Sequence, residues 1–178
     1  MKRPTNPQIT LKPQDLVVLL KLLSLGSQRR NFAELAADLS MSASEVHACV
    51  GRAMEARLVH VVDDHLHVTK SALKEFLLHG ARYAFPPVLG ALTRGVPTAH
   101  AAPPLRDEMN QSAAESPVWP CPDGEQRGPA LYPLYPSVPQ AARKDPKLYE
   151  MLALFDALRS GAARDRALAS RMLEARLA

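Results

Sequence analysis

Apolar residues recur at helical spacing through the N-terminal third of the chain, and this period predicts three helices. The first begins at Pro13, which suits the first helical position, and ends near Gly26, which can take a left-handed conformation. The second and third each begin with the spacing of a capping box, given by Asn31 with Glu34 and by Ser42 with Glu45. The inward stripes of the three helices are Leu16, Leu19, Leu20 and Leu23; Phe32, Leu35, Ala36 and Leu39; and Val46, Cys49, Val50, Ala53 and Met54.

After Leu58 the apolar period changes from helical to alternating. If Asp63 and Asp64 form a two-residue turn, the flanking residues make a hairpin with one apolar face and one histidine-rich face. The apolar face carries Val59, Val61, Leu66 and Val68, and the other face carries His60, Val62, His65 and His67. A fourth helix, capped by Thr69 or Ser71, is expected to end near Gly80.

Three helices followed by a hairpin have the order of a winged helix-turn-helix. The segment FAELAADLSMSASEVHACVGRAMEARLVHVVDDHLHVTKSA resembles the DNA-reading half of bacterial MarR-type regulators, whose wing opens with a leucine-valine pair that Leu58 and Val59 match. The resemblance covers roughly residues 11 to 80. Ser40 and Arg57 depart from it, because glycine is common at both positions. The expected fold is therefore mainly α with a small β-hairpin wing, followed by a proline-rich extended arm and C-terminal helices.

The third helix has an outward flank of unusually small residues. A helix that enters the major groove must bring its backbone close to the bases in a groove about 12 Å wide, and small side chains permit this approach. The expected base-reading residues are Ala43, Ser44, His47, Ala48, Gly51 and Arg52. Arg52 can donate two hydrogen bonds to guanine. Two alternatives stay open: the small residues pack against the first helix or a second subunit, and Arg52 is an ordinary solvated charge.

Phosphate contacts are expected where the second and third helices begin. Arg29, Arg30 and Asn31 precede the second helix, and Ser42 precedes the third, so side chains and N-terminal amides can meet the DNA backbone. Asp63 and Asp64 at the wing tip repel phosphate, which argues against insertion of the wing into the minor groove.

Proline divides the chain into segments 1–84, 85–144 and 145–178, interpreted as a winged helix-turn-helix domain, a proline-rich extended arm and a C-terminal helical segment. The arm keeps aromatic residues, including Tyr132 and Tyr135, so it is expected to lie on a surface, either of its own chain or of a partner. Its central stretch RDEMNQSAAES has the composition of a loop.

The pattern of residues 145–178 predicts one or two helices. Asp145 is the expected cap, Pro146 takes the first helical position, and a break is expected near Ser160 and Gly161. Its apolar stripes need a cover, and a second copy of the chain is the expected one. The residues assigned to this dimer or partner contact are Leu148, Leu152, Phe155, Leu168, Met172, Tyr132 and Tyr135. Such a homodimer would place two reading helices one DNA turn apart.

Composition excludes several other classes. The 178 residues carry a formal charge of +4, which is compatible with a polyanionic partner, and no apolar run is long enough for a membrane span. A cytoplasmic location is expected. Cys49 and Cys121 form no spaced metal or disulfide set, and His60 with His67 lacks a third ligand, so neither a metal nor a cofactor is predicted. HExxH, GxSxG and phosphate-cradling glycine motifs are absent, which argues against an enzyme.

The leading hypothesis from the sequence is a sequence-specific transcriptional regulator, acting as a dimeric repressor on double-stranded DNA. The alternative is a protein-interaction module or antitoxin-like adaptor, in which the winged helix is a scaffold and the proline- and tyrosine-rich arm holds a partner protein.

Overall fold

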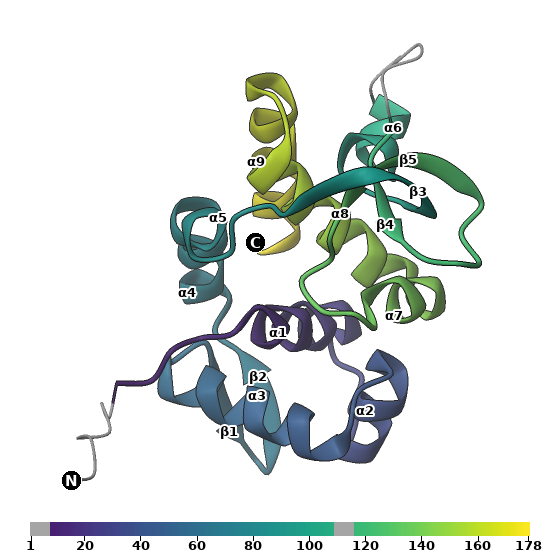
Figure 1. Ribbon diagram of the computed structural model, residues 1–178. Helices are drawn as coiled ribbons and strands as arrows, with labels where there is room; N and C mark the ends of the chain where they lie inside the picture. The colour runs from purple at the N-terminus through teal and green to yellow at the C-terminus, as the bar shows by residue number, and fades with distance from the viewer. Residues whose placement is uncertain (1–7, 109–115) are drawn as a thin grey trace, which may run out of the picture.

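The computed structural model describes residues 8–108 and 116–178. The chain is arranged in two parts that share one interior (Figure 1). Helices α1, α2 and α3 with a two-stranded hairpin form the lower part in that view, and a three-stranded sheet with the C-terminal helices forms the upper part. The buried apolar cluster runs continuously from Leu16 in the lower part to Trp119 and Leu154 in the upper part.

The three N-terminal helices are α1 (Pro13–Leu25), α2 (Phe32–Leu39) and α3 (Ala43–Glu55), which confirms the predicted helices. Gly26 ends α1 with φ 58°. At the start of α2 the Glu34 amide donates to Asn31 Oδ1 at 2.9 Å and the Asn31 amide donates to Glu34 Oε2 at 2.8 Å, so this capping box is complete. Ser42 accepts from the Glu45 amide at 3.2 Å and caps α3.

The hairpin consists of β1 (Val59–Val62) and β2 (His65–Val68), joined by Asp63 and Asp64. Both turn residues have positive φ, 48° and 60°, as a type I′ turn requires. The pairs Val59 with Val68 and Val61 with Leu66 lie on one face, which confirms the predicted register. His60 and His67 stack across the strands with ring centroids 5.9 Å apart.

The fourth helical run is longer than predicted. It begins as α4 (Lys70–Glu75), continues through a π-helical turn η1 (Phe76–Gly80), and ends as α5 (Ala81–Ala84). Its first turns lie beside the C-terminus, where Lys74 Nζ is 3.0 Å from Glu174 Oε1 and Lys70 Nζ donates to the Ala178 carbonyl at 2.8 Å. The run therefore ties the lower part to the last helix.

The proline-rich segment is folded against the chain rather than extended as an arm, and this part of the expectation is corrected. Its strands are β3 (Leu89–Pro97), β4 (Val118–Pro120) and β5 (Gln126–Leu131). β3 pairs antiparallel with both neighbours, and β4 meets β5 at one parallel bridge, Val118 with Ala130. A side chain on Gly124 would collide with the backbone of Gly95, so the strands can close only with glycine there.

Short helices connect these strands to the rest of the molecule. They are η2 (Ala99–Ala101), α6 (Leu105–Glu108) and α7 (Val138–Lys144). Most of the expected loop RDEMNQSAAES, residues 109–115, lies outside the described residues. α7 supports the C-terminal end of α2, because Lys144 Nζ donates to the Ala37 carbonyl at 2.8 Å and Ser137 Oγ donates to the Leu39 carbonyl at 2.7 Å.

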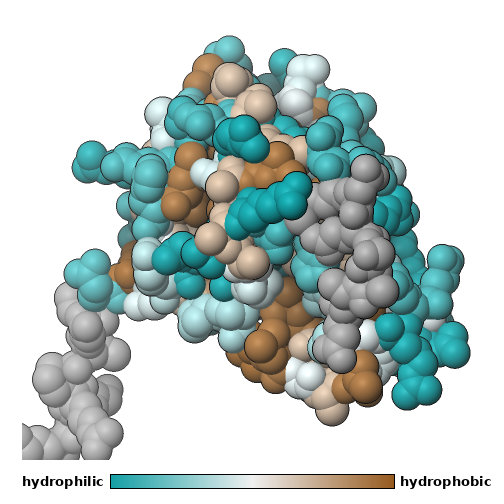
Figure 2. All heavy atoms as spheres, turned by 90° about the horizontal axis from the view of Figure 1, so that it is seen from above, coloured by the Kyte–Doolittle hydropathy of each residue, from teal (hydrophilic) through white to brown (hydrophobic). Residues whose placement is uncertain are grey.

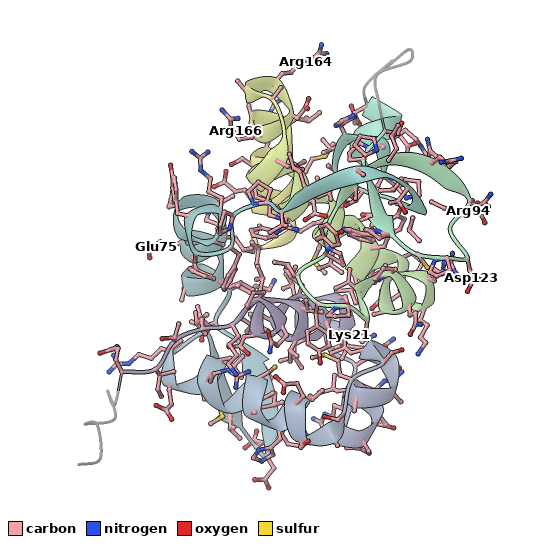
Figure 3. The ribbon with its side chains drawn as sticks, in the orientation of Figure 1. Lys21, Glu75, Arg94, Asp123, Arg164 and Arg166 are labelled. Atoms are coloured by element: carbon pink, nitrogen blue, oxygen red, sulfur yellow. The ribbon has the colours of Figure 1, made fainter. Side chains whose placement is uncertain are left out.

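The C-terminal helices are α8 (Pro146–Ser160) and α9 (Ala163–Arg176). Asp145 caps α8 by accepting from the Leu148 amide at 3.1 Å, and the chain breaks at Gly161 as predicted. α8 is the buried helix of the upper part and packs against α1 of the lower part, whereas Arg164 and Arg166 project outward from α9 (Figure 3). With two sheets among its helices, the chain is mixed α/β rather than mainly α.

Buried polar groups fasten the three-stranded sheet to α8. Asp156 of α8 accepts from Thr98 Oγ1 at 2.7 Å and from Trp119 Nε1 at 2.5 Å, and Arg159 Nε donates to its other oxygen at 2.7 Å. Burial raises the pKa of Tyr149 to about 12, so its hydroxyl keeps its proton and donates to the Pro97 carbonyl at 2.7 Å. The segment is therefore held on its own chain.

Candidate nucleic-acid interface

α3 lies at the lower surface of the molecule with its apolar stripe turned inward (Figure 1). Val46, Cys49, Val50 and Ala53 are buried, which confirms four of the five predicted inward positions. Met54 is the exception. Its side chain is 42% exposed, so it belongs to the surface at the end of the helix.

The outward flank of α3 from Ala43 to Gly51 carries small side chains except at His47. Ala43, Ser44, His47 and Gly51 are exposed, and Ala48 is half-buried. The His47 ring lies 5.0 Å from the ring of Phe32 at the start of α2, so the two helices present one continuous surface. These five positions lie where the sequence predicted them.

Gly51 has no packing reason to be glycine. A methyl group at position 51 would meet no atom of the described chain within 4 Å beyond its own stretch of helix, and the backbone there is helical. Glycine inside a helix costs about 1 kcal/mol relative to alanine. The fold gains nothing from it, because neither α1 nor any other described element approaches this position.

Arg52 does not belong to the outward flank, and its predicted base-reading role is set aside. Its guanidinium turns inward to Asp15 of α1, with Nη2 2.6 Å from Oδ1 and Nε 2.8 Å from Oδ2. The Arg52 side chain is 17% exposed, and Asp15 is almost completely buried. A buried carboxylate needs a charged partner, and the only arginine or lysine of α3 supplies it.

The groups around this ion pair form a closed network. Glu45 accepts from Gln14 Nε2 at 3.0 Å, and this hydrogen bond, together with the nearby Arg52 charge, lowers the pKa of Glu45. Burial and the neighbouring Asp15 raise the pKa of the Cys49 thiol far above its usual range. Because Cys49 stays a thiol, it is no nucleophile, and Glu45 is already engaged within the fold.

The residues predicted to contact phosphate surround the start of α2 and α3. Arg29 and Arg30 are exposed, and Arg30 Nε lies 3.5 Å from Asp38 Oδ2, so Arg29 carries the freer charge. Asn31 and Ser42 use their side chains as helix caps, each accepting from one amide of the first turn, so only the other amides of that turn can meet a ligand. A cleft of about 220 Å³ separates this loop from the hairpin and is also lined by His65 and His67.

Three of the seven residues predicted to form a dimer or partner contact are interior residues of one chain, and for these three the assignment is corrected. Leu148, Leu152 and Phe155 are buried in the core. Leu168 and Met172 pack against the same core and are half-buried. α8 is covered by its own chain on all sides, because α1, α7, α9 and the η2 turn contact it. Among the assigned residues, Tyr132 is 49% exposed, whereas Tyr135 is half-buried.

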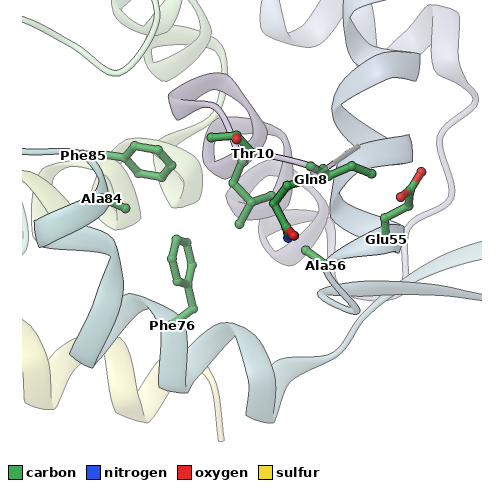
Figure 4. A pocket seen from close by; sticks show the side chains of 9 residues that line it. Gln8, Thr10, Glu55, Ala56, Phe76, Ala84 and Phe85 are labelled. Carbon is green, nitrogen blue, oxygen red and sulfur yellow. The ribbon is translucent and has the colours of Figure 1, made fainter. Parts of the chain in front are cut away.

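A cleft of about 740 Å³ lies between the segment 8–11, the end of α3 and the α4–α5 run. Figure 4 shows Gln8, Thr10 and Glu55 on one side and Phe76, Ala84 and Phe85 on the other. Glu55 is its only ionisable side chain. The cleft therefore holds no pair of groups for acid–base chemistry, and nowhere in the described ranges do three metal-binding side chains converge.

Comparison of the chain with protein-family models, with curated proteins and with solved structures gave no match. Within residues 8–108 and 116–178, no helix has the length and apolar character needed to cross a bilayer.

Proposed function

We propose that the protein is a winged helix-turn-helix regulator that binds double-stranded DNA through α3 and represses transcription. The order of α1, α2, α3 and the β1–β2 hairpin supports this proposal, as does the backbone at Ser40 and Arg57. Both residues have positive φ, 52° and 59°, at the positions where glycine is common in the family that the sequence resembles. Ser40 and Arg57 therefore adopt the left-handed backbone that glycine favours, so both turns can have the geometry that is common in that family.

The observation that carries the proposal is Gly51. A residue that costs helix stability and fills no internal space is explained by an external surface that must come close to the helix backbone. The floor of a DNA major groove is such a surface. Ser44 and His47 then supply hydrogen-bond donors to base edges, and Ala43 and Ala48 supply contacts to thymine methyl groups.

Arg52 contributes indirectly in this scheme. By joining α3 to Asp15 of α1, it holds the orientation of the helix that enters the groove. Phosphate contacts come from Arg29 and from the first amides of α2 and α3, so affinity for any duplex falls steeply as salt concentration rises.

Enlarging the slim flank tests the proposal. Gly51→Ala and Gly51→Gln should raise the free energy of unfolding by about 0.5–1 kcal/mol, because both residues are better helix formers in open space. Both should weaken binding to DNA selected from a random pool, the glutamine variant by roughly tenfold or more, about 1.4 kcal/mol. Denaturant unfolding and fluorescence anisotropy measure the two effects.

Ala167→Gln is the matched control, because Ala167 is an exposed alanine on α9, far along the chain from α3. It should leave DNA affinity unchanged. If selection from the random pool enriches no sequence, or if Gly51→Gln binds selected DNA as tightly as the parent chain, the proposed function is wrong.

A second candidate is a protein-interaction module, an antitoxin-like adaptor. It is favoured by the absence of a free cation from the outward flank of α3 and by exposed apolar side chains on α2, α3 and β1, which are Phe32, Met54, Val61 and Val62. Asp63 and Asp64 at the hairpin tip also oppose DNA. On this reading the random pool yields no preferred sequence, and Gly51→Gln weakens binding of a copurifying protein instead.

A further inference from the structure

The side chains at the start of β3 are exposed on both faces of the strand. Residues 88–92 are all exposed, although alternate residues of a strand point to opposite faces. Val88 is 57% exposed, Leu89 70% and Leu92 65%. Figure 2 views the molecule from above and shows apolar side chains gathered toward its lower edge. That edge is the front of the molecule in Figure 1, where β3 crosses. An apolar strand exposed on both faces is an open pairing site.

The backbone of the same stretch has an unpaired edge. The Val88 carbonyl accepts from the Tyr132 amide at 2.9 Å, so the polar groups of Val88 point toward the β5 side. Alternation then directs the amide and carbonyl of Leu89 to the opposite edge. β4 covers that edge only from Gly95 onward, so within the described chain no strand pairs with the outward edge at Leu89.

Tyr132 extends the apolar surface. Its ring lies against Gly90, because a side chain on Gly90 would come within 2.9 Å of Tyr132 Cε2. Arg159 holds Tyr132 in place by donating to its carbonyl at 2.8 Å. The exposed parts of Val88, Leu89, Leu92 and Tyr132 together offer on the order of 500 Å², a large fraction of the ~800 Å² that each partner of a stable complex buries.

We propose that this surface, which we call the β3 edge (residues 88–92 with Tyr132), pairs with the β3 edge of a second copy of the chain. The stretch Val88 to Leu92 carries no charge, so two identical edges meet without like-charge repulsion. Antiparallel pairing about a two-fold axis near Gly90 places Leu89 of one copy opposite Ala91 of the other, a large residue against a small one. The pairing then joins β3 of one copy to β3 of the other across the axis.

This dimer differs from the one that the C-terminal stripes suggested, and it does not depend on DNA binding. Sedimentation velocity over a hundredfold range of protein concentration should show a monomer–dimer equilibrium. Leu92→Asp should raise the dissociation constant at least about tenfold, because two carboxylates enter one apolar interface. Val62→Asp is the matched control, since Val62 is a strand valine of 46% exposure on the hairpin, and it should leave the equilibrium unchanged.

A second pair of variants separates backbone pairing from side-chain packing. Leu89→Pro removes the outward amide, while Leu89→Ala keeps it, so the proline variant should dissociate more readily than the alanine variant. Circular dichroism checks that each variant is folded. A parent chain that stays monomeric at all concentrations overturns the proposal. A dimer that withstands Leu92→Asp overturns it as well, whatever the outcome for DNA.

Discussion

Each part of the molecule has one buried carboxylate that forms an ion pair with an arginine. The two ion pairs differ in the distance along the chain between their residues. In the lower part, Asp15 of α1 is 1% exposed and receives Arg52 from α3. In the upper part, Asp156 is 2% exposed and receives Arg159 from the next turn of α8. The first pair joins two helices, whereas the second is local to one helix and leaves the carboxylate free to bind other elements.

Asp156 uses that freedom to hold the sheet. Thr98 follows β3 and Trp119 lies in β4, and both donate to the same carboxylate oxygen. Burial raises the pKa of Asp156 even though Arg159 and both hydrogen bonds oppose the rise. Burying such a carboxylate costs free energy. Its main effect is to fix the place on α8 where the proline-rich segment packs. Asp15 instead sets the direction of the helix that we propose enters DNA.

Removing the upper carboxylate should have the largest effect. Asp156→Ala leaves the Arg159 guanidinium, the Trp119 indole and the Thr98 hydroxyl buried without their acceptor, so the free energy of unfolding should fall by about 4 kcal/mol. Denaturant titration with Trp119 fluorescence measures this loss, because Trp119 is the only tryptophan. Asp156→Asn keeps one acceptor for Trp119 or Thr98 and should lose less. Equal losses in the two variants would contradict the network.

Breaking the lower pair should have the next largest effect. Arg52→Met keeps most of the side-chain volume but leaves Asp15 without its cation, so the free energy of unfolding should fall by about 3 kcal/mol. Adding Asp15→Asn to Arg52→Met should recover part of this loss, because no unpaired charge then remains. A double-mutant cycle by denaturant unfolding measures the coupling, and purely additive effects would contradict the proposed coupling of α1 and α3.

The link between the two parts should show the smallest effect and a dependence on pH. Lys21 of α1 (Figure 3) has its Nζ 3.0 Å from both Asp38 Oδ2 and Asp145 Oδ2. Burial tends to raise the pKa of Asp145, but hydrogen bonds from Ser24 and the Leu148 amide and the Lys21 charge outweigh it, so the pKa is lowered. Asp145→Asn should cost roughly 2 kcal/mol at neutral pH.

The sign of the pH effect follows from the lowered pKa. A carboxyl whose pKa is lower in the folded chain contributes stability above its unfolded pKa and loses it as pH falls through the folded pKa. The difference in unfolding free energy between the parent chain and Asp145→Asn should therefore shrink as the solution is acidified from about pH 5 downward. Thermal unfolding across that range measures the difference, and a constant difference would exclude the charge of Asp145 as its cause.

The helix caps could be predicted because they are local. Asn31 and Ser42 each bond to an amide three residues away, so the sequence window that contains both groups contains the whole interaction. The hairpin register followed in the same way from period-two alternation and a two-residue turn. The exposed positions of the α3 flank also followed from helical period.

The role of Arg52 could not be predicted from the helix that carries it. Its position on the helical wheel allowed either an outward or an inward side chain, and Asp15, which decides between them, lies on another helix. Likewise, the proline-rich segment showed no clear strand period, since β3 is exposed on both faces in its first half and interrupted by a bulge at Ala91. Its pairing partners lie 21 to 42 residues downstream, from Pro97 with Val118 to Leu89 with Leu131, so the local pattern carried no signal of them.

By itself the sequence determined the helices of the lower part, their caps, the hairpin and the small residues that line the outer side of α3, because each depends on neighbours within a few positions. Only the tertiary structure decided which charges remain free and which surfaces remain uncovered. It engaged Arg52 with Asp15, covered the apolar stripes of α8 with the same chain, and left the β3 edge exposed. The physical reason is that burial and ion pairing are set by groups distant along the chain, which meet only when the interior closes.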